Sequence, residues 1–182
     1  MNSFNFKSWS LFLVKASLLF FTFIFLALPL DANASTYQAK QPLFERALQR
    51  TKDGDFSQAL ELWNAFLDLS PDNAAALSNR GNVRLVLGDP KGAIIDQTKA
   101  LELSPDEIDP HLNRGIAEEA LKDWESAITD YNWILEQEPD NASALYNLAN
   151  VSGSKGEWFQ ARVLFGQAAI ANPGFAMARS SK

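Results

Sequence analysis

Three asparagines recur at intervals of 34 residues, at Asn79, Asn113 and Asn147, and in the first two cases an arginine follows, Arg80 or Arg114. A carboxamide offers one acceptor and two donors. It can therefore donate a hydrogen bond to the C=O of a peptide backbone and accept one from its N–H at the same time, without contacting the peptide's side chains. The chemistry available at these positions is reversible hydrogen bonding.

Residues for bond-making chemistry are scarce. The sequence has no cysteine and one histidine, His111. It contains no G-x-S-x-G or H-E-x-x-H motif and no glycine-rich phosphate loop. We therefore expect no enzymatic activity, no catalytic residues, no cofactor and no metal site. The acidic residues are expected at helix caps, turns and solvent-exposed faces.

The elements that position the asparagines follow from the same period. Prolines recur every 34 residues, at Pro71, Pro105, Pro139 and Pro173. A glycine, which ends a helix by adopting the left-handed conformation, recurs at Gly54, Gly88 and Gly156. An acidic residue that can cap the next helix follows each glycine. The pattern predicts an all-α chain of four helix-turn-helix blocks, at residues 40–73, 74–107, 108–141 and 142–175.

These four blocks, with small residues at positions 8 and 20 of each, resemble the tetratricopeptide repeat family. The resemblance implies an α-solenoid in which the first helix of every block lines a concave groove. It places Asn79, Asn113 and Asn147 on the groove at position 6, with Asn82 and Asn150 beside them at position 9. The alternative is that these asparagines make only local contacts between neighbouring blocks.

Position 7 departs from the usual leucine of the family and is Arg46, Arg80, Arg114 or Leu148. The facing position 23 is Leu62, Asp96, Asp130 or Leu164. We predict ion pairs between Arg80 and Asp96 and between Arg114 and Asp130, each bridging the two helices of its block. A buried ion pair of this kind fixes the register of the two helices more reliably than it adds to the stability of the fold. Arg46 has no acidic counterpart.

The charges restrict the partner. The chain is acidic, with a formal net charge of −6, and it lacks the basic stripe that nucleic-acid binding requires. Only Lys52 is basic among the groove positions, whereas Glu45, Asp109 and Glu119 are acidic. This disfavours a clamp for a terminal carboxylate. We expect a protein or peptide partner whose bound segment is neutral or basic.

The first 34 residues have the features of an export signal. Lys7 and Lys15 precede or flank a mainly apolar run from Ala16 to Leu30, and Ala32-Asn33-Ala34 matches a cleavage site. The alternative is an uncleaved membrane anchor. The combination resembles small exported tetratricopeptide proteins of the cyanobacterial periplasm or the thylakoid and chloroplast lumen, which implies a periplasmic or lumenal location.

The last block raises the question of what covers its end. Residues 176–182 read as the start of a further first helix, a shortened cap, so Val163 and Ala169 are expected to lack a cover. Two functions remain open. One is an exported adaptor that holds an extended partner segment in its groove. The other is an oligomeric or membrane-tethered scaffold that acts through its ends, above all by self-association at the C-terminal end, and through its convex face.

The aromatic residues are interpreted by block position. Trp63, Trp124 and Trp158 are expected in the core, and His111 is expected as a buried or half-buried imidazole in a packing position. Trp133 and Phe159 lie outside the packing pattern, so either is a candidate for an exposed contact on the convex side.

Overall fold

The computed structural model describes residues 32–174, with side chains from Lys40 onward. The chain divides into units of residues 1–39 and 40–182, and the repeats lie in the second. The described residues form eight helices and no strand. The helices are α2 (Ala32–Lys52), α3 (Phe56–Leu69), α4 (Ala74–Val86), α5 (Pro90–Leu103), α6 (Ile108–Ala120), α7 (Trp124–Gln137), α8 (Ala142–Ser154) and α9 (Trp158–Ala171).

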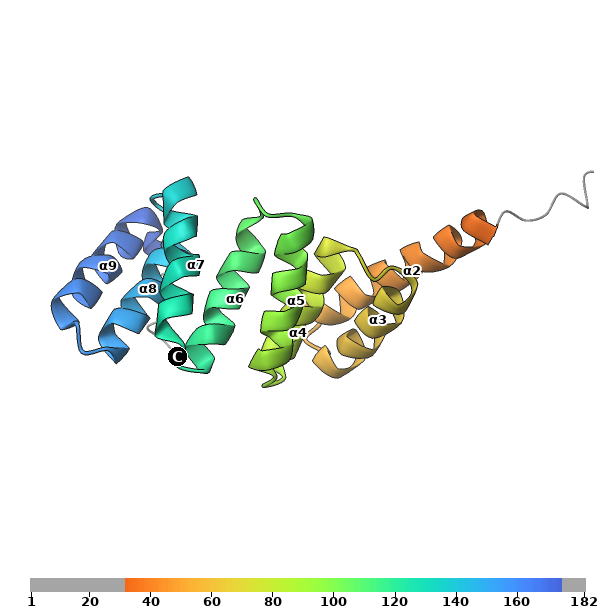
Figure 1. The fold of residues 1–182 in the computed structure, drawn as a ribbon, viewed down its shortest axis with the longest axis horizontal. Helices are drawn as coiled ribbons and strands as arrows, with labels where there is room; N and C mark the ends of the chain where they lie inside the picture. The colour runs from red at the N-terminus through yellow and green to blue at the C-terminus, as the bar shows by residue number, and fades with distance from the viewer. Residues whose placement is uncertain (1–31, 175–182) are drawn as a thin grey trace, which may run out of the picture. The chain divides into compact units, whose positions relative to one another are not determined.

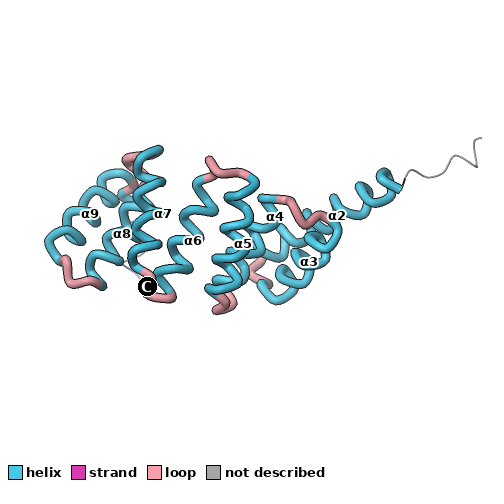
Figure 2. Tube along the Cα trace, viewed as in Figure 1, coloured by secondary structure: helices cyan, strands magenta, loops and turns pink. Residues whose placement is uncertain are grey.

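From α3 to α9, each helix packs against the next one along the chain (Figure 1). The helices of a block are joined by a tight turn and so are successive blocks, as the short loops in Figure 2 show. In addition, the first helices α4, α6 and α8 contact one another in order. They therefore form one continuous layer, and the second helices lie against it. The predicted all-α solenoid of helix-turn-helix blocks is confirmed.

The turn inside each block depends on backbone that only some residues tolerate. Gly54, Gly88 and Gly156 have φ values of 77°, 83° and 82°. The corresponding residue of the third block is Lys122, which adopts the same left-handed region with φ of 63°. A side chain there is strained. The acidic residue after the turn caps the next helix in three blocks, where Asp55, Asp89 and Asp123 accept from backbone N–H groups. Glu157 makes no such bond.

Small residues at position 8 let the two helices of a block approach closely. A Cβ added at Gly115 would lie 2.6 Å from Tyr131 Cε1, and one at Gly81 would lie 2.7 Å from Gln97 Nε2. The same position is Ala47 in the first block and Ala149 in the last, both fully buried. The ring or amide at position 24 thus determines whether a methyl group fits at position 8.

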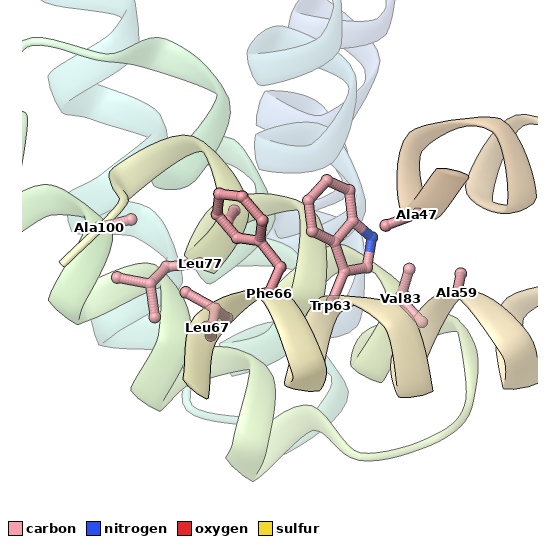
Figure 3. Close-up of a cluster of buried hydrophobic side chains, with 9 residues drawn as sticks. Ala47, Ala59, Trp63, Phe66, Leu67, Leu77, Val83 and Ala100 are labelled. Carbon is pink, nitrogen blue, oxygen red and sulfur yellow. The ribbon is translucent and has the colours of Figure 1, made fainter. Parts of the chain in front are cut away.

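The core of the first repeat is built around aromatic rings of α3 (Figure 3). Trp63 is fully buried and meets Phe44 and Phe66 edge to face, with ring centroids 5.0 and 6.4 Å apart. Its indole N–H donates to Thr51 Oγ1 at 3.1 Å. Because the polar end of Trp63 is satisfied, the ring can fill the core without an orphaned donor. The expectation that Trp63 is core is confirmed.

Two expectations need correction. Trp158 is 73 % exposed, whereas its counterpart Trp124 is half-buried. The difference arises because Trp124 lies beside α8 of the next block, and no described helix follows α9. Trp133 is no exposed contact, since it is half-buried and stacks on the imidazole of His111 with centroids 3.8 Å apart.

Most of the expected signal 1–34 and all of the expected tail 176–182 lie outside the described residues. Residues 32–34, the expected cleavage site, form the start of α2. None of the helices in the described part of the chain has the length and apolar character needed to cross a bilayer.

Candidate functional site

The five candidate asparagines all lie on the layer of first helices. Asn79 and Asn82 are on α4, Asn113 is on α6, and Asn147 and Asn150 are on α8. Four of them are half-buried. Asn147 is the exception, since it is only 4 % exposed. It lies deeper than a freely available groove residue was expected to lie.

A hollow of about 380 Å³ lies where α6, the start of α7 and α8 meet. Ile116, Ala120 and Trp124 provide apolar lining, and Asn147 and Asn150 provide amides. Glu119 adds a carboxylate whose Oε2 also accepts from the Tyr131 hydroxyl at 3.2 Å. An apolar hollow with a few polar groups at its edge is typical of a binding site.

A second hollow of about 250 Å³ lies between α4 and the start of α6. Its lining includes Ser78 and Asn79 from α4, and Glu107 and Asp109 from the other side. The Asn79 amide donates one hydrogen to the carbonyl of Ala75 at 2.8 Å. Part of its hydrogen-bonding capacity is therefore used within its own helix.

The structure thus separates the row of asparagines into two places. Asn79 belongs to one hollow, Asn147 and Asn150 to the other, and Asn82 and Asn113 line neither. The acidic groove residues Asp109 and Glu119 each lie at a hollow. These two hollows each combine asparagine amides with a carboxylate, so the asparagines do not form one even ladder.

The predicted pair of the second block is present and is part of a larger cluster. Arg80 donates from Nε and Nη2 to the two oxygens of Asp96, at 2.9 and 2.7 Å. Its Nη1 donates to Asn64 in the preceding block at 3.0 Å. Arg84 adds a bond from Nη1 to Asp96 Oδ2 at 2.8 Å. Since Asp96 is buried, these bonds replace the water that its carboxylate has lost.

The third block has the predicted Arg114–Asp130 pair, with both bonds at 2.8 Å. His111 Nδ1 lies 2.8 Å from Asp130 Oδ1, so the buried imidazole has a partner in the same carboxylate. The hydrogen bond to Asp130 raises the pKa of the Arg114 guanidinium. Arg114 Nη1 also reaches Thr98 of the preceding block at 3.4 Å. Arg46, in contrast, is exposed.

Glu118 is a buried acid beside this cluster. Its Oε1 lies 3.9 Å from Arg114 Nε, and its buried Oε2 has no hydrogen-bond partner. Burial, reinforced by the nearby Asp130 charge, raises the pKa of Glu118 to about 7. Burial also raises the pKa of Tyr131 far above its usual value, with Glu119 adding to the effect. The third block therefore holds one carboxyl that is half-protonated near neutral pH.

Sequence reasoning missed three of these residues. Arg84 follows Arg80 by four residues, so the helical period alone places both on one face. Glu118 follows Arg114 by the same spacing. The stacking of Trp133 on His111 had no comparable signal, because it joins two helices.

No group of three or more His, Asp or Glu residues within the described part of the chain could hold a metal ion.

Comparison with known proteins adds the following. A model of the tetratricopeptide repeat family matches residues 42–108 and 112–179. No curated protein matches the chain. The first tetratricopeptide repeat domain of Spaghetti (RPAP3), solved with the HSP90 peptide SRMEEVD, is 28 % identical, with a TM-score of 0.62 over 65 % of this chain and 94 % of that one.

Two bacterial structures are also similar. A tetratricopeptide repeat protein of Parabacteroides merdae is 26 % identical with a TM-score of 0.65, covering 75 % of this chain and 55 % of that one. MamA from Desulfovibrio magneticus is 17 % identical with a TM-score of 0.67, covering 78 % of this chain and 85 % of that one. The MamA likeness concerns the fold alone.

Proposed function

We propose, since this chain belongs to the tetratricopeptide repeat family, that it is an adaptor whose first-helix layer binds an extended segment of a partner protein. The fold is that of a protein–protein interaction module. The observation that carries the finer proposal is the hollow formed by Ile116, Ala120 and Trp124 with Asn147 and Asn150 at its edge. It offers an apolar side chain a pocket and offers the adjoining backbone an amide.

The separation of the two hollows determines how long a bound partner segment must be. The two hollows are one block apart, because α6 contributes to both. Neighbouring packed helices lie roughly 10 Å apart, so Asn79 on α4 and Asn150 on α8, two first-helix spacings apart, are separated by roughly 20 Å. An extended peptide rises ~3.3 Å per residue. A segment of about six residues could therefore reach from the hollow at Asn79 to the hollow at Asn150. The bound stretch would be extended because a helix of that length is too short.

The charges favour a neutral or basic segment. Asp109 and Glu107 lie at the first hollow and Glu119 at the second, with no basic residue in the lining of either. The peptide bound to the Spaghetti domain, SRMEEVD, has three acidic residues and one basic residue. The fold likeness therefore supports peptide binding by this chain, and the local charges argue for a different peptide.

We extend the proposal to an exported location, in the periplasm or a lumen. It is supported by Lys7, Lys15, the apolar run and the Ala32-Asn33-Ala34 sequence. N-terminal sequencing of the protein recovered from the exported fraction tests it. A mature terminus at Ser35 is expected. An intact terminus in the membrane fraction would instead indicate the uncleaved anchor.

The binding test uses peptides of about ten residues, one set basic, one neutral and one acidic, titrated by fluorescence anisotropy. Neutral or basic peptides should bind and acidic ones should bind more weakly. Asn79→Ala with Asn150→Ala should weaken binding about tenfold, because each lost hydrogen bond costs roughly 0.5–1.5 kcal/mol.

The matched control is Asn132→Ala, an exposed asparagine on the second helix α7. It should leave binding unchanged. Equal losses in both variants, or a preference for acidic peptides, would contradict the proposal. Asn147→Ala is avoided, since a buried asparagine would confound binding with folding.

A second candidate function is a scaffold that self-associates at its C-terminal end. The exposed apolar side chains of α9 favour it, because they offer a contact surface that the repeat itself does not use.

A further inference from the structure

Helix α9 has an apolar face directed away from the other helices in the described part of the chain. Phe159 is 75 % exposed, Ile170 is 82 % exposed and Val163 is 44 % exposed. At 100° per residue these three and Gly166 fall on one side of the helix, opposite the buried Ala161, Leu164 and Ala168. The packing of the last block therefore does not need this face to be apolar.

The other blocks show what these positions normally carry. The counterparts of Phe159 in α3, α5 and α7 are Ser57, Lys91 and Glu125, and those of Ile170 are Asp68, Glu102 and Glu136. All six are exposed. At these two positions a serine or a charged side chain is replaced by a large apolar side chain in the last block only. A helix that continued the array would leave these positions in solvent, as α4, α6 and α8 do in the inner blocks.

Gly166 lies near the middle of α9, and a Cβ placed there would meet nothing within 4 Å. A glycine inside a helix costs about 1 kcal/mol relative to alanine. No contact among the described residues accounts for it, whereas a second helix that crosses α9 closely at this point would.

We propose that α9 is a homodimer interface, in which two copies of this helix pack antiparallel about a two-fold axis near Gly166. The face is complementary to itself under that operation, because Ile170 of one copy meets Val163 of the other while the two glycines form the crossing point. A bulky side chain thus faces a smaller one on each side of the axis.

Charge and area are consistent with this occupant. The charged residue at the edge is Arg162, which lies over its own Phe159 ring at 5.8 Å. In the antiparallel arrangement the two Arg162 side chains are roughly 12 Å apart along the axis, which exceeds the Debye length of about 10 Å. The three exposed apolar side chains of this face, Phe159, Val163 and Ile170, present on the order of 400 Å² per copy. Two copies bury about 800 Å², which is the size of a weak, reversible interface.

Sedimentation equilibrium of the purified protein tests the proposal. We expect a dimer, with Ile170→Glu raising the dissociation constant at least about a hundredfold because it places a charge against Val163 of the other copy in the buried contact. The matched control is Thr129→Glu, at the exposed position of α7 that corresponds to Val163. It should leave the dissociation constant unchanged, and circular dichroism should show equal helicity in all three proteins.

Cysteine crosslinking locates the contact independently, because the chain contains no cysteine. Gly166→Cys should give a disulfide-linked dimer on mild oxidation, and so should the double variant Val163→Cys with Ile170→Cys, whose cysteines face each other across the interface. Ser57→Cys, on α3, should not. A monomer at all concentrations, a dimer unaffected by Ile170→Glu, or equal crosslinking through Ser57→Cys would overturn the proposal. Loss of peptide binding would not affect this result, since the hollows at Asn79 and Asn150 lie on the other layer.

Discussion

The third and fourth blocks fill the same two positions in opposite ways. In the third, Arg114 and Asp130 form a buried ion pair that also holds His111. In the fourth, Leu148 and Leu164 are both buried, in one apolar cluster. The backbone geometry is the same, with first and second helices of matching length. The repeat therefore requires two complementary side chains there and does not require a particular chemistry.

The comparison also explains where the third block is vulnerable. Its polar core depends on every partner being present, because a buried charge without a partner costs far more than the intact pair contributes. An apolar pair has no such dependence. Four predictions test this difference, beginning with the largest effect.

Replacing Asp130 by leucine should cost about 3–5 kcal/mol, because it leaves the Arg114 charge buried without its main partner. The further change Arg114→Leu, which copies the fourth block, should recover a large part of that loss. Urea denaturation of the two variants and the wild type measures this. A double variant no more stable than Asp130→Leu would show that the ion pair itself holds the block together.

Glu118→Gln should make stability less dependent on pH. The folded pKa of about 7 lies above the unfolded value of 4.5, so the folded state binds more protons between these values and wild-type stability falls as pH rises through this window. The groups facing Glu118 are Arg114, Asp130 and Asp123. The variant should match the wild type below pH ~4.5 and exceed it by up to ~3 kcal/mol above pH ~7.

Urea titrations at several pH values provide the test, with Glu125→Gln as the control because Glu125 is exposed on α7. A wild-type stability that stays level across this window would contradict the buried, uncompensated position of Glu118.

Gly115→Ala should destabilise the third block by about 1–3 kcal/mol, because the new methyl group lies 2.6 Å from the Tyr131 ring. The reverse change in the fourth block, Ala149→Gly, should cost only about 1 kcal/mol. Thermal unfolding compares the two. If Gly115→Ala is neutral, the Tyr131 ring can move, and the close crossing of α6 and α7 is not required.

Asp123→Ala should cost about 1 kcal/mol, since Asp123 accepts from Ser126 N–H and caps α7. Glu157→Ala should cost much less, because Glu157 forms no capping bond to α9. The difference between the melting temperatures of the two variants measures the contribution of the Asp123 capping bond. Equal losses would mean that Glu157 stabilises the start of α9 through its charge alone.

Much of the fold could be predicted because it rests on local signals that repeat. The left-handed glycines, the capping aspartates and the small residues at position 8 each act within a few residues of their own place, and the 34-residue period aligns them. The Arg80–Asp96 and Arg114–Asp130 contacts could be predicted for the same reason, since alignment of the blocks places both members at facing positions. The depth of Asn147 could not, because the burial of a side chain depends on the helices packed around it and not on its spacing along the chain.

The sequence by itself determined the fold class, the register of the four blocks and the choice of ion pair or leucine pair in the last three, because these depend on spacing along the chain. Only the tertiary structure decided that the asparagines fall into two hollows, that Trp133 covers His111 and that Trp158 is exposed. It also revealed the uncovered face of α9 as a whole. These features depend on which neighbour lies beside a side chain, and that is determined by how successive blocks stack.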